Sequence, residues 1–190
     1  GVISATVYQA TESLVLSILV SVLVGATIGF INGFLITTFA MPPFITTLAT
    51  QQSARGAALL FTGGHTVDGI GTIVNLTQGR WLGIPICVYI LAIVCFMCYI
   101  LVHRMKFGRY LYAVGSNITA AKASGVNVKR VRLMAYVIGG CIIGLAAIIY
   151  ASRVNSGQPA GGVGLEFQAI TAAIIGGAGM SGGTGSVPGA

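Results

Sequence analysis

The stretch 103–132 carries most of the positive charge of this chain and contains no acidic residue. Seven of the ten basic residues lie in it: Arg104, Lys106, Arg109, Lys122, Lys129, Arg130 and Arg132. The uncharged runs Leu82–Val102 and Leu133–Ser152 flank it. Each run has the roughly twenty residues that an α-helix needs to cross a hydrocarbon core. Because Lys and Arg beside a membrane segment stay on the cytoplasmic side, this pattern predicts that the basic loop (103–132) is cytoplasmic and that the loops 62–80 and 153–165 are external.

The composition sets the chain apart from soluble domains, in which about a quarter of the residues are charged. Mean hydropathy is +0.93, and only 7% of the residues are charged. The chain is therefore predicted to be an all-α integral membrane protein with one transmembrane domain. The basic loop accounts for most of the net charge, so no nucleic-acid partner is expected. With three acidic residues and no G-x-x-x-x-G-K-[S/T] motif, the chain is predicted to be no enzyme and to hold no cofactor or metal.

The apolar segment Leu14–Phe39 is predicted to be a membrane helix that packs closely on another one. Glycines recur at every fourth position, at Gly25, Gly29 and Gly33, and the run 133–152 holds a similar Gly-x-x-x-Gly motif. Small residues at this spacing let two helix backbones approach each other in lipid. Asn32 is the one strongly polar side chain near the middle of the segment, and we expect it to face another helix or a cavity.

The segment Phe44–Phe61 is predicted to be a helix that is unusually polar for a membrane. At helical spacing Thr47, Thr50 and Gln51 share one face, and Arg55 lies beside them. Polar groups in a membrane segment are costly unless they face protein or water, so the stripe and Asn32 are a candidate translocation path. The alternative is a short interfacial helix from which Arg55 reaches the headgroups.

A second candidate for the path lies near the end of the chain. Glu166–Ile175 is apolar but too short to span a bilayer, and it runs into the glycine-rich stretch 176–185. Irregular backbone at membrane depth must be buried in protein or line a cavity, which predicts a re-entrant element with Gly176 and Gly177 on the path. The stretch from Gly177 to Gly182, through Met180 and Ser181, matches G-x-G-x-x-G, but this membrane setting does not fit dinucleotide binding.

Inside the basic loop, small residues predict a short docking helix that ends at a glycine cap. The predicted coupling residues are Thr119, Ala120, Ala121, Lys122, Ala123, Ser124, Gly125 and Val126. At these residues the chain resembles the permease subunits of bacterial ATP-binding-cassette (ABC) importers for sugars of the ribose/galactose type, which also include quorum-signal importers. The E-A-A-x-x-x-G pattern of that family is matched by Ala120, Ala121 and Gly125, with Thr119 where the glutamate usually stands.

Further pieces resemble the same family in the same order along the chain. They are Asn32-Gly33, Pro43–Leu48, Arg55-Gly56, Thr62–Gly64, Ala151–Arg153, Gln158-Pro159, Leu165–Ile170, Ile175–Gly177 and 181–186. The resemblance implies a permease subunit in the bacterial inner membrane, working by alternating access on a small polar solute, with a monosaccharide expected. It also implies ABC ATPase subunits on the coupling helix, a periplasmic substrate-binding protein and a second permease subunit, in a homodimer or pseudo-dimer.

Family members are longer than this chain, so helices of the bundle are expected to be missing at both ends. Two other functions fit the residues. One is a branched-chain amino-acid ABC permease, and the other is a membrane channel or scaffold without ATP coupling, in which the basic loop would be only a lipid anchor.

Overall fold

The computed structural model describes residues 1–190 except 82, 180–181, 188 and 190. It divides into two compact units. The first unit consists of Gly1–Ile90 and Tyr136–Gly161, and the second consists of 91–135 and 162–190. Among the described residues, three helices are long and apolar enough to cross a membrane: Leu14–Thr38, Ile86–Arg104 and Val128–Val154. The prediction of an all-α membrane fold is confirmed, with four two-residue strands as the β-structure of the described part.

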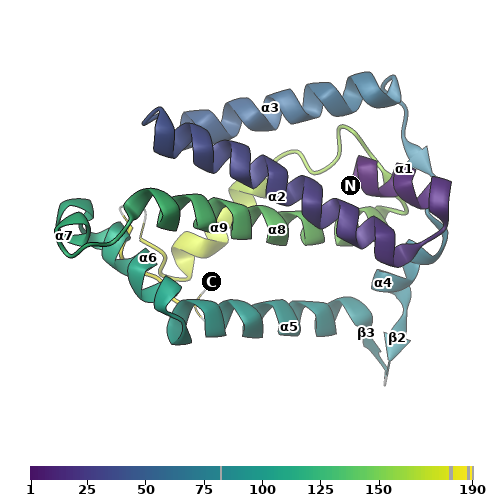
Figure 1. Ribbon diagram of the computed structural model, residues 1–190. Coiled ribbons are helices and arrows are strands. Elements are labelled where there is room, and N and C mark those ends of the chain that lie inside the picture. Colours follow the sequence, from purple (N-terminus) through teal and green to yellow (C-terminus); the bar gives the residue numbers. More distant parts are fainter. Residues whose placement is uncertain (82, 180–181, 188, 190) are drawn as a thin grey trace. The chain divides into compact units, whose positions relative to one another are not determined.

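Helices α1 (Val2–Thr11), α2 (Leu14–Thr38) and α3 (Pro43–Thr62) open the first unit (Figure 1). The Ser13 hydroxyl accepts a hydrogen bond from the Leu16 N–H and caps the start of α2. Pro43 occupies the first turn of α3, where its missing N–H would have no helical partner. The predicted bounds of α2 and α3 are thus confirmed to within one residue, whereas the sequence predicted no element over α1.

Within the first unit, α2 crosses the part of α8 (Val128–Val154) that follows Tyr136, with glycine against glycine. A Cβ placed on Gly25 would overlap the carbonyl oxygen of Gly140, and a Cβ on Gly140 would overlap that of Gly25. The Ser21 hydroxyl donates to the carbonyl of Gly144 across the same crossing (2.7 Å). The two predicted packing motifs are therefore each other's partner.

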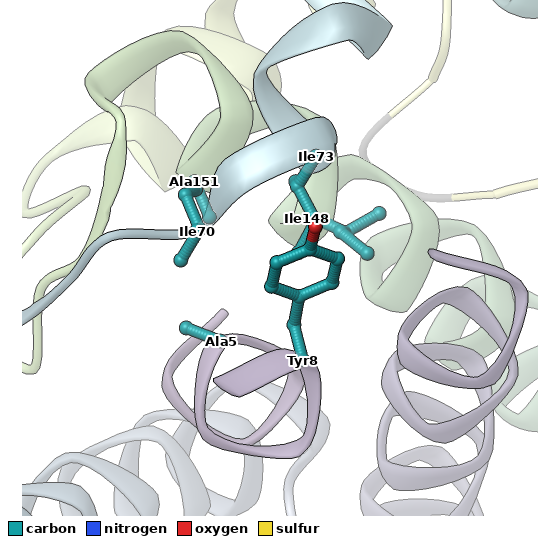
Figure 2. Packing of buried hydrophobic residues seen from close by; sticks show 6 residues of the cluster. All are labelled: Ala5, Tyr8, Ile70, Ile73, Ile148 and Ala151. Carbon is teal, nitrogen blue, oxygen red and sulfur yellow. The ribbon is translucent and has the colours of Figure 1, made fainter. Parts of the chain in front are cut away.

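The core of the first unit lies where α1 meets the chain after α3. Figure 2 shows the Tyr8 ring of α1 among isoleucines of two other segments. The cluster consists of Ala5, Tyr8, Ile70, Ile73, Ile148 and Ala151. The Ser152 hydroxyl donates to the Ile73 carbonyl (2.6 Å), which ties η1 (Gly71–Val74) to α8. Strand β1 (Val67–Asp68) pairs antiparallel with β4 (Ser156–Gly157), so the two predicted external loops are joined to each other.

A short hairpin precedes the next long helix. Strand β2 (Arg80–Trp81) pairs with β3 (Ile84–Pro85) after the short helix α4 (Asn75–Gln78), and α5 (Ile86–Tyr99) follows. The sequence predicted that this membrane segment begins at Leu82, which lies outside the described residues. The helix begins at Ile86 because Pro85 still belongs to the hairpin. Proline is tolerated at the start of a helix but not in its interior, so the helix does not extend back past Pro85.

The basic loop is mostly helical. The helix of α5 continues through a π-helical turn, η2 (Ile100–Arg104), and two short helices follow, α6 (Lys106–Ser116) and α7 (Ile118–Ala123). A Cβ at Gly108 would overlap the Val102 carbonyl, so α6 turns back closely over the end of η2. In the same unit, α9 (Leu165–Ile175) has eleven residues, which confirms the predicted short apolar helix.

Candidate coupling and translocation sites

Helix α7 is delimited by two local signals. At its start, the Asn117 side chain accepts a hydrogen bond from the Ala120 N–H (3.0 Å), an N-cap that satisfies one of the free amides of the first turn. At its end, the Val126 N–H donates to the Ala121 carbonyl and the Gly125 N–H to the Lys122 carbonyl, both at 3.0 Å. This pair of bonds is a Schellman motif, and Gly125 has φ +79° within it. The predicted glycine cap is confirmed.

An apolar cluster holds α7 on its neighbours. Ala121 is only 4% exposed and packs with Val114 of α6 and with Val128 and Val131 at the start of α8. The half-buried Val126, which follows the glycine cap, packs against the same cluster. The sequence grouped Ala121 with the docking residues, but its side chain points into the loop. It can support docking only by holding α7 in place.

The outer side of α7 is made of small and polar residues, apart from Ile118 at its first position, which is 38% exposed. Those that are exposed are Thr119, Ala120, Lys122, Ala123, Ser124 and Gly125. Lys129 and Arg130, at the start of α8, are exposed as well. No residue of 103–132 is acidic, and the first turn of α7 therefore has no carboxylate to balance the positive end of the helix. Such a surface admits a partner's backbone at close range and favours acidic groups on that partner.

The polar stripe of α3 meets α2 at one point. The Thr50 hydroxyl lies 2.7 Å from the Asn32 side-chain oxygen and 2.8 Å from the Thr46 carbonyl, so its single proton is shared between two acceptors. Asn32 is half-buried between the helices, and Thr46, one turn earlier on α3, is buried. The prediction that Asn32 faces another helix is confirmed. Thr46 was not among the predicted path residues, although it lies one helical turn before Thr50.

Thr47, another member of the stripe, bonds within its own helix. The Thr47 hydroxyl donates to the carbonyl of Pro43 in its own helix (3.0 Å). Gln51 and Arg55 are half-exposed on α3. The structure therefore brings Asn32 and Thr50 together, and Thr47, Gln51 and Arg55 lie on the same helix as Thr50.

Gly176 and Gly177, the remaining candidates for the path, end α9. The Ala178 N–H donates to the Ala173 carbonyl (2.9 Å) and the Gly177 N–H to the Ile174 carbonyl (3.0 Å). Gly177 has φ +90°, so this is a second Schellman motif, and it explains why glycine stands there. Met180 and Ser181 of the G-x-G-x-x-G match lie outside the described residues. Among the described residues, no group of three His, Cys, Asp or Glu side chains could hold a metal ion.

The family model described as "Branched-chain amino acid transport system / permease component" matches residues 1–190. The chain belongs to this permease family. It is 40% identical over 161 residues to the ribose import permease protein RbsC of Bacillus subtilis (strain 168), an alignment that covers 83% of this chain and 50% of that protein. It is also 40% identical over 190 residues to the L-arabinose transport system permease protein AraH of Escherichia coli (strain K12), with 98% and 57% covered.

A third permease of the family is similar over much of the chain. The D-allose transport system permease protein AlsC of Escherichia coli (strain K12) is 37% identical over 158 residues, with 83% of this chain and 48% of that protein covered. The resemblance to ribose-type sugar permeases is confirmed, and the chain spans about half the length of these relatives. No solved structure matches it. Its family and the three long apolar helices of its described residues place it in the inner membrane as a multi-pass protein.

Proposed function

We propose that this chain is part of the membrane permease of an ABC importer that moves a monosaccharide into the cell. The observation that carries the proposal is α7, a short helix capped at both ends, held on an apolar cluster and exposing small residues. It occurs in a chain whose relatives are named as permeases for ribose, L-arabinose and D-allose. These three names favour a sugar over a branched-chain amino acid, the solute in the description of the family model.

In this proposal the basic loop is cytoplasmic and α7 is the coupling helix. Two ABC ATPase subunits dock on α7 and on its counterpart in a second permease subunit, so this chain needs no nucleotide or other cofactor of its own. The segments joined by β1 and β4 then lie on the outer side, where a periplasmic binding protein delivers the sugar. The small exposed residues of α7 suit a groove that receives the helix backbone closely.

The transport step is alternating access. When the ATPases close, they move α7, and the cluster of Ala121, Val114, Val128 and Val131 passes this motion to α6 and α8 as a rigid body. The helices then open the path to the other side. The polar contact of Asn32 with Thr50, together with Thr47, Gln51 and Arg55, supplies hydrogen-bonding groups for a sugar. In the second unit, Gly176 and Gly177 stay a separate candidate for the path.

The test is Ala123→Trp in the full-length permease, copurified with its ATPase. Ala123 is exposed, so the loop should stay folded while the bulky ring keeps α7 out of the groove. We expect the amount of copurified ATPase to fall about tenfold, equivalent to roughly 1.4 kcal/mol.

Ala160→Trp is the matched control, because Ala160 is exposed in the segment predicted to lie on the opposite side of the membrane. It should leave the copurified ATPase unchanged. Full association in Ala123→Trp would leave the basic loop as a lipid anchor and favour a channel or scaffold without ATP coupling. Uptake of leucine in place of ribose, arabinose and allose by reconstituted vesicles would favour the branched-chain amino-acid permease.

A further inference from the structure

We propose that a backbone contact between α6 and the glycine segment (Gly182–Gly185) links the coupling loop to α9 and sets the position of α9. This inference rests on the proposed function, because it takes α7 to be the coupling helix. It adds a second element that the coupling helix moves, and it names Tyr112, Gly115, Gly182 and Gly183 as positioning residues.

The contact is made by backbone on both sides. A Cβ on Gly115 would lie 2.6 Å from the Gly183 nitrogen, and a Cβ on Gly183 would lie 2.8 Å from the Cα of Ser116. A Cβ on Gly182 would come within 2.9 Å of the Gly115 carbonyl oxygen. Real Cβ atoms essentially never approach other atoms this closely, so each of the three positions requires glycine. The left-handed φ angles of Gly182 (+86°) and Gly183 (+78°) add to this requirement.

The Tyr112 side chain also stabilises the contact between α6 and the glycine segment. The Tyr112 hydroxyl donates a hydrogen bond to the Gly185 carbonyl at 2.5 Å. Tyr112 lies one helical turn before Gly115, so both residues face the glycine segment from the same side of α6. A pocket of about 290 Å³ lies beside them, lined by residues of α6 and of 183–187 and by Val102. The glycine backbone and the Tyr112 hydroxyl are therefore the points that join the two segments.

Helix α6 connects this contact to the coupling helix through another face. Val114 belongs to the apolar cluster that buries Ala121 of α7. At 100° per residue, Val114 lies about 200° around α6 from Tyr112, on nearly the opposite side. Asn117 also joins α6 to α7 directly. Its N–H donates a hydrogen bond to the Ala113 carbonyl at the end of α6, and its side chain caps the start of α7. A motion of α7 must therefore move α6 and the glycine segment with it.

Hydrogen bonds continue from the glycine segment to α9. The Gly182 N–H donates to the Gly179 carbonyl (3.0 Å), and the Gly179 N–H donates to the Thr184 carbonyl (3.2 Å). The Ala178 N–H then donates a hydrogen bond to the Ala173 carbonyl (2.9 Å) at the end of α9. Close-packed backbone has no rotamers with which to absorb a displacement, so this path transmits movement with little slack. The glycines of 176–185 thus have a mechanical role at the end of α9, which belongs to the second candidate for the path.

The test compares Gly115→Ala with Gly139→Ala in the full-length permease with its ATPases in reconstituted vesicles. Both are glycines within helices, but a Cβ on Gly139 meets nothing within 4 Å. We expect Gly115→Ala to keep its copurified ATPase while solute-stimulated hydrolysis and sugar uptake fall about two- to thirtyfold, the range for mutations along a contact network. Gly139→Ala should behave like the unmodified protein. Tyr112→Phe removes only the hydrogen bond and should give a smaller loss of the same kind.

The outcomes separate this inference from the proposed function. If the unmodified permease binds no ATPase or shows no stimulation, the proposed function fails and this inference fails with it. If the unmodified permease is stimulated and Gly115→Ala matches Gly139→Ala, only the inference is overturned. Loss of ATPase binding in Gly115→Ala would also overturn it, because the contact would then support α7 and not α9. If Gly115→Ala does not accumulate in the membrane, Tyr112→Phe decides: unchanged stimulation overturns the inference.

Discussion

Two of the places where segments of this chain meet backbone to backbone through glycine differ in regularity. Gly25 and Gly29 of α2 meet Gly140 and Gly144 of α8 at helical spacing, so two straight helices touch along a row. Gly115 of α6 instead meets an irregular segment in which the glycines also take left-handed φ angles. The regular contact joins long apolar helices and supports the membrane core. The irregular one joins a short helix to a loop, and suits a part that transmits movement.

The largest effect is expected at the regular contact. In Gly140→Leu the new side chain would meet the backbone of α2 at Gly25, so the helices must separate over their whole crossing. We expect the free energy of unfolding of the first unit to fall by about 3 kcal/mol. The matched control is Gly139→Leu, one residue earlier on α8, where a Cβ meets nothing within 4 Å. Thermal unfolding in detergent measures both variants, and equal melting temperatures would show that the crossing does not depend on close approach.

A second experiment concerns a glycine that is needed for its backbone angle alone. No atom lies within 4 Å of a Cβ on Gly125, yet its φ is +79°. Gly125→Val should destabilise the cap of α7 by about 1–2 kcal/mol, because a β-branched residue is strained in the left-handed region. Hydrogen exchange of the 118–126 amides should become faster, without a change in the α2–α8 crossing. Gly125→Asn, which tolerates this angle, is the control, and equally fast exchange in both variants would contradict the explanation.

The smallest effect is expected where α2 meets its other neighbour through polar atoms. The Thr50 hydroxyl and the Asn32 oxygen are 2.7 Å apart. Polar contacts between membrane helices couple by about 0.6 kcal/mol on average, far less than the glycine crossing. A double-mutant cycle with Asn32→Leu and Thr50→Val, followed by thermal unfolding, should give a coupling of that size. If the coupling were as large as the effect of Gly140→Leu, the distinction between the two faces of α2 would be lost.

Features that depend on local spacing could be predicted from the residues alone. The apolar lengths predicted the long helices, and Gly125 predicted the end of α7. Pro42 and Pro43 give a local reason for the break between α2 and α3, because proline lacks the backbone N–H that a helix interior needs. These signals can be read because the physical cause lies within a few residues of its effect. The glycine rows at 25–33 and 140–144 likewise predicted close packing of two helices, since membrane helices use small residues at that spacing.

Which segments meet became clear only from the folded chain. Nothing local distinguishes Ala121 from Ala123, yet one side chain packs against Val114 and Val128 while the other is exposed. The pairing of β1 with β4 joins residues far apart in the chain, and α1 is ordered by the isoleucines that its Tyr8 contacts. No periodic pattern in the sequence predicts the contact of Gly115 with Gly183, because an irregular segment has no repeat. Such choices depend on packing between distant segments, which residue spacing along the chain does not encode.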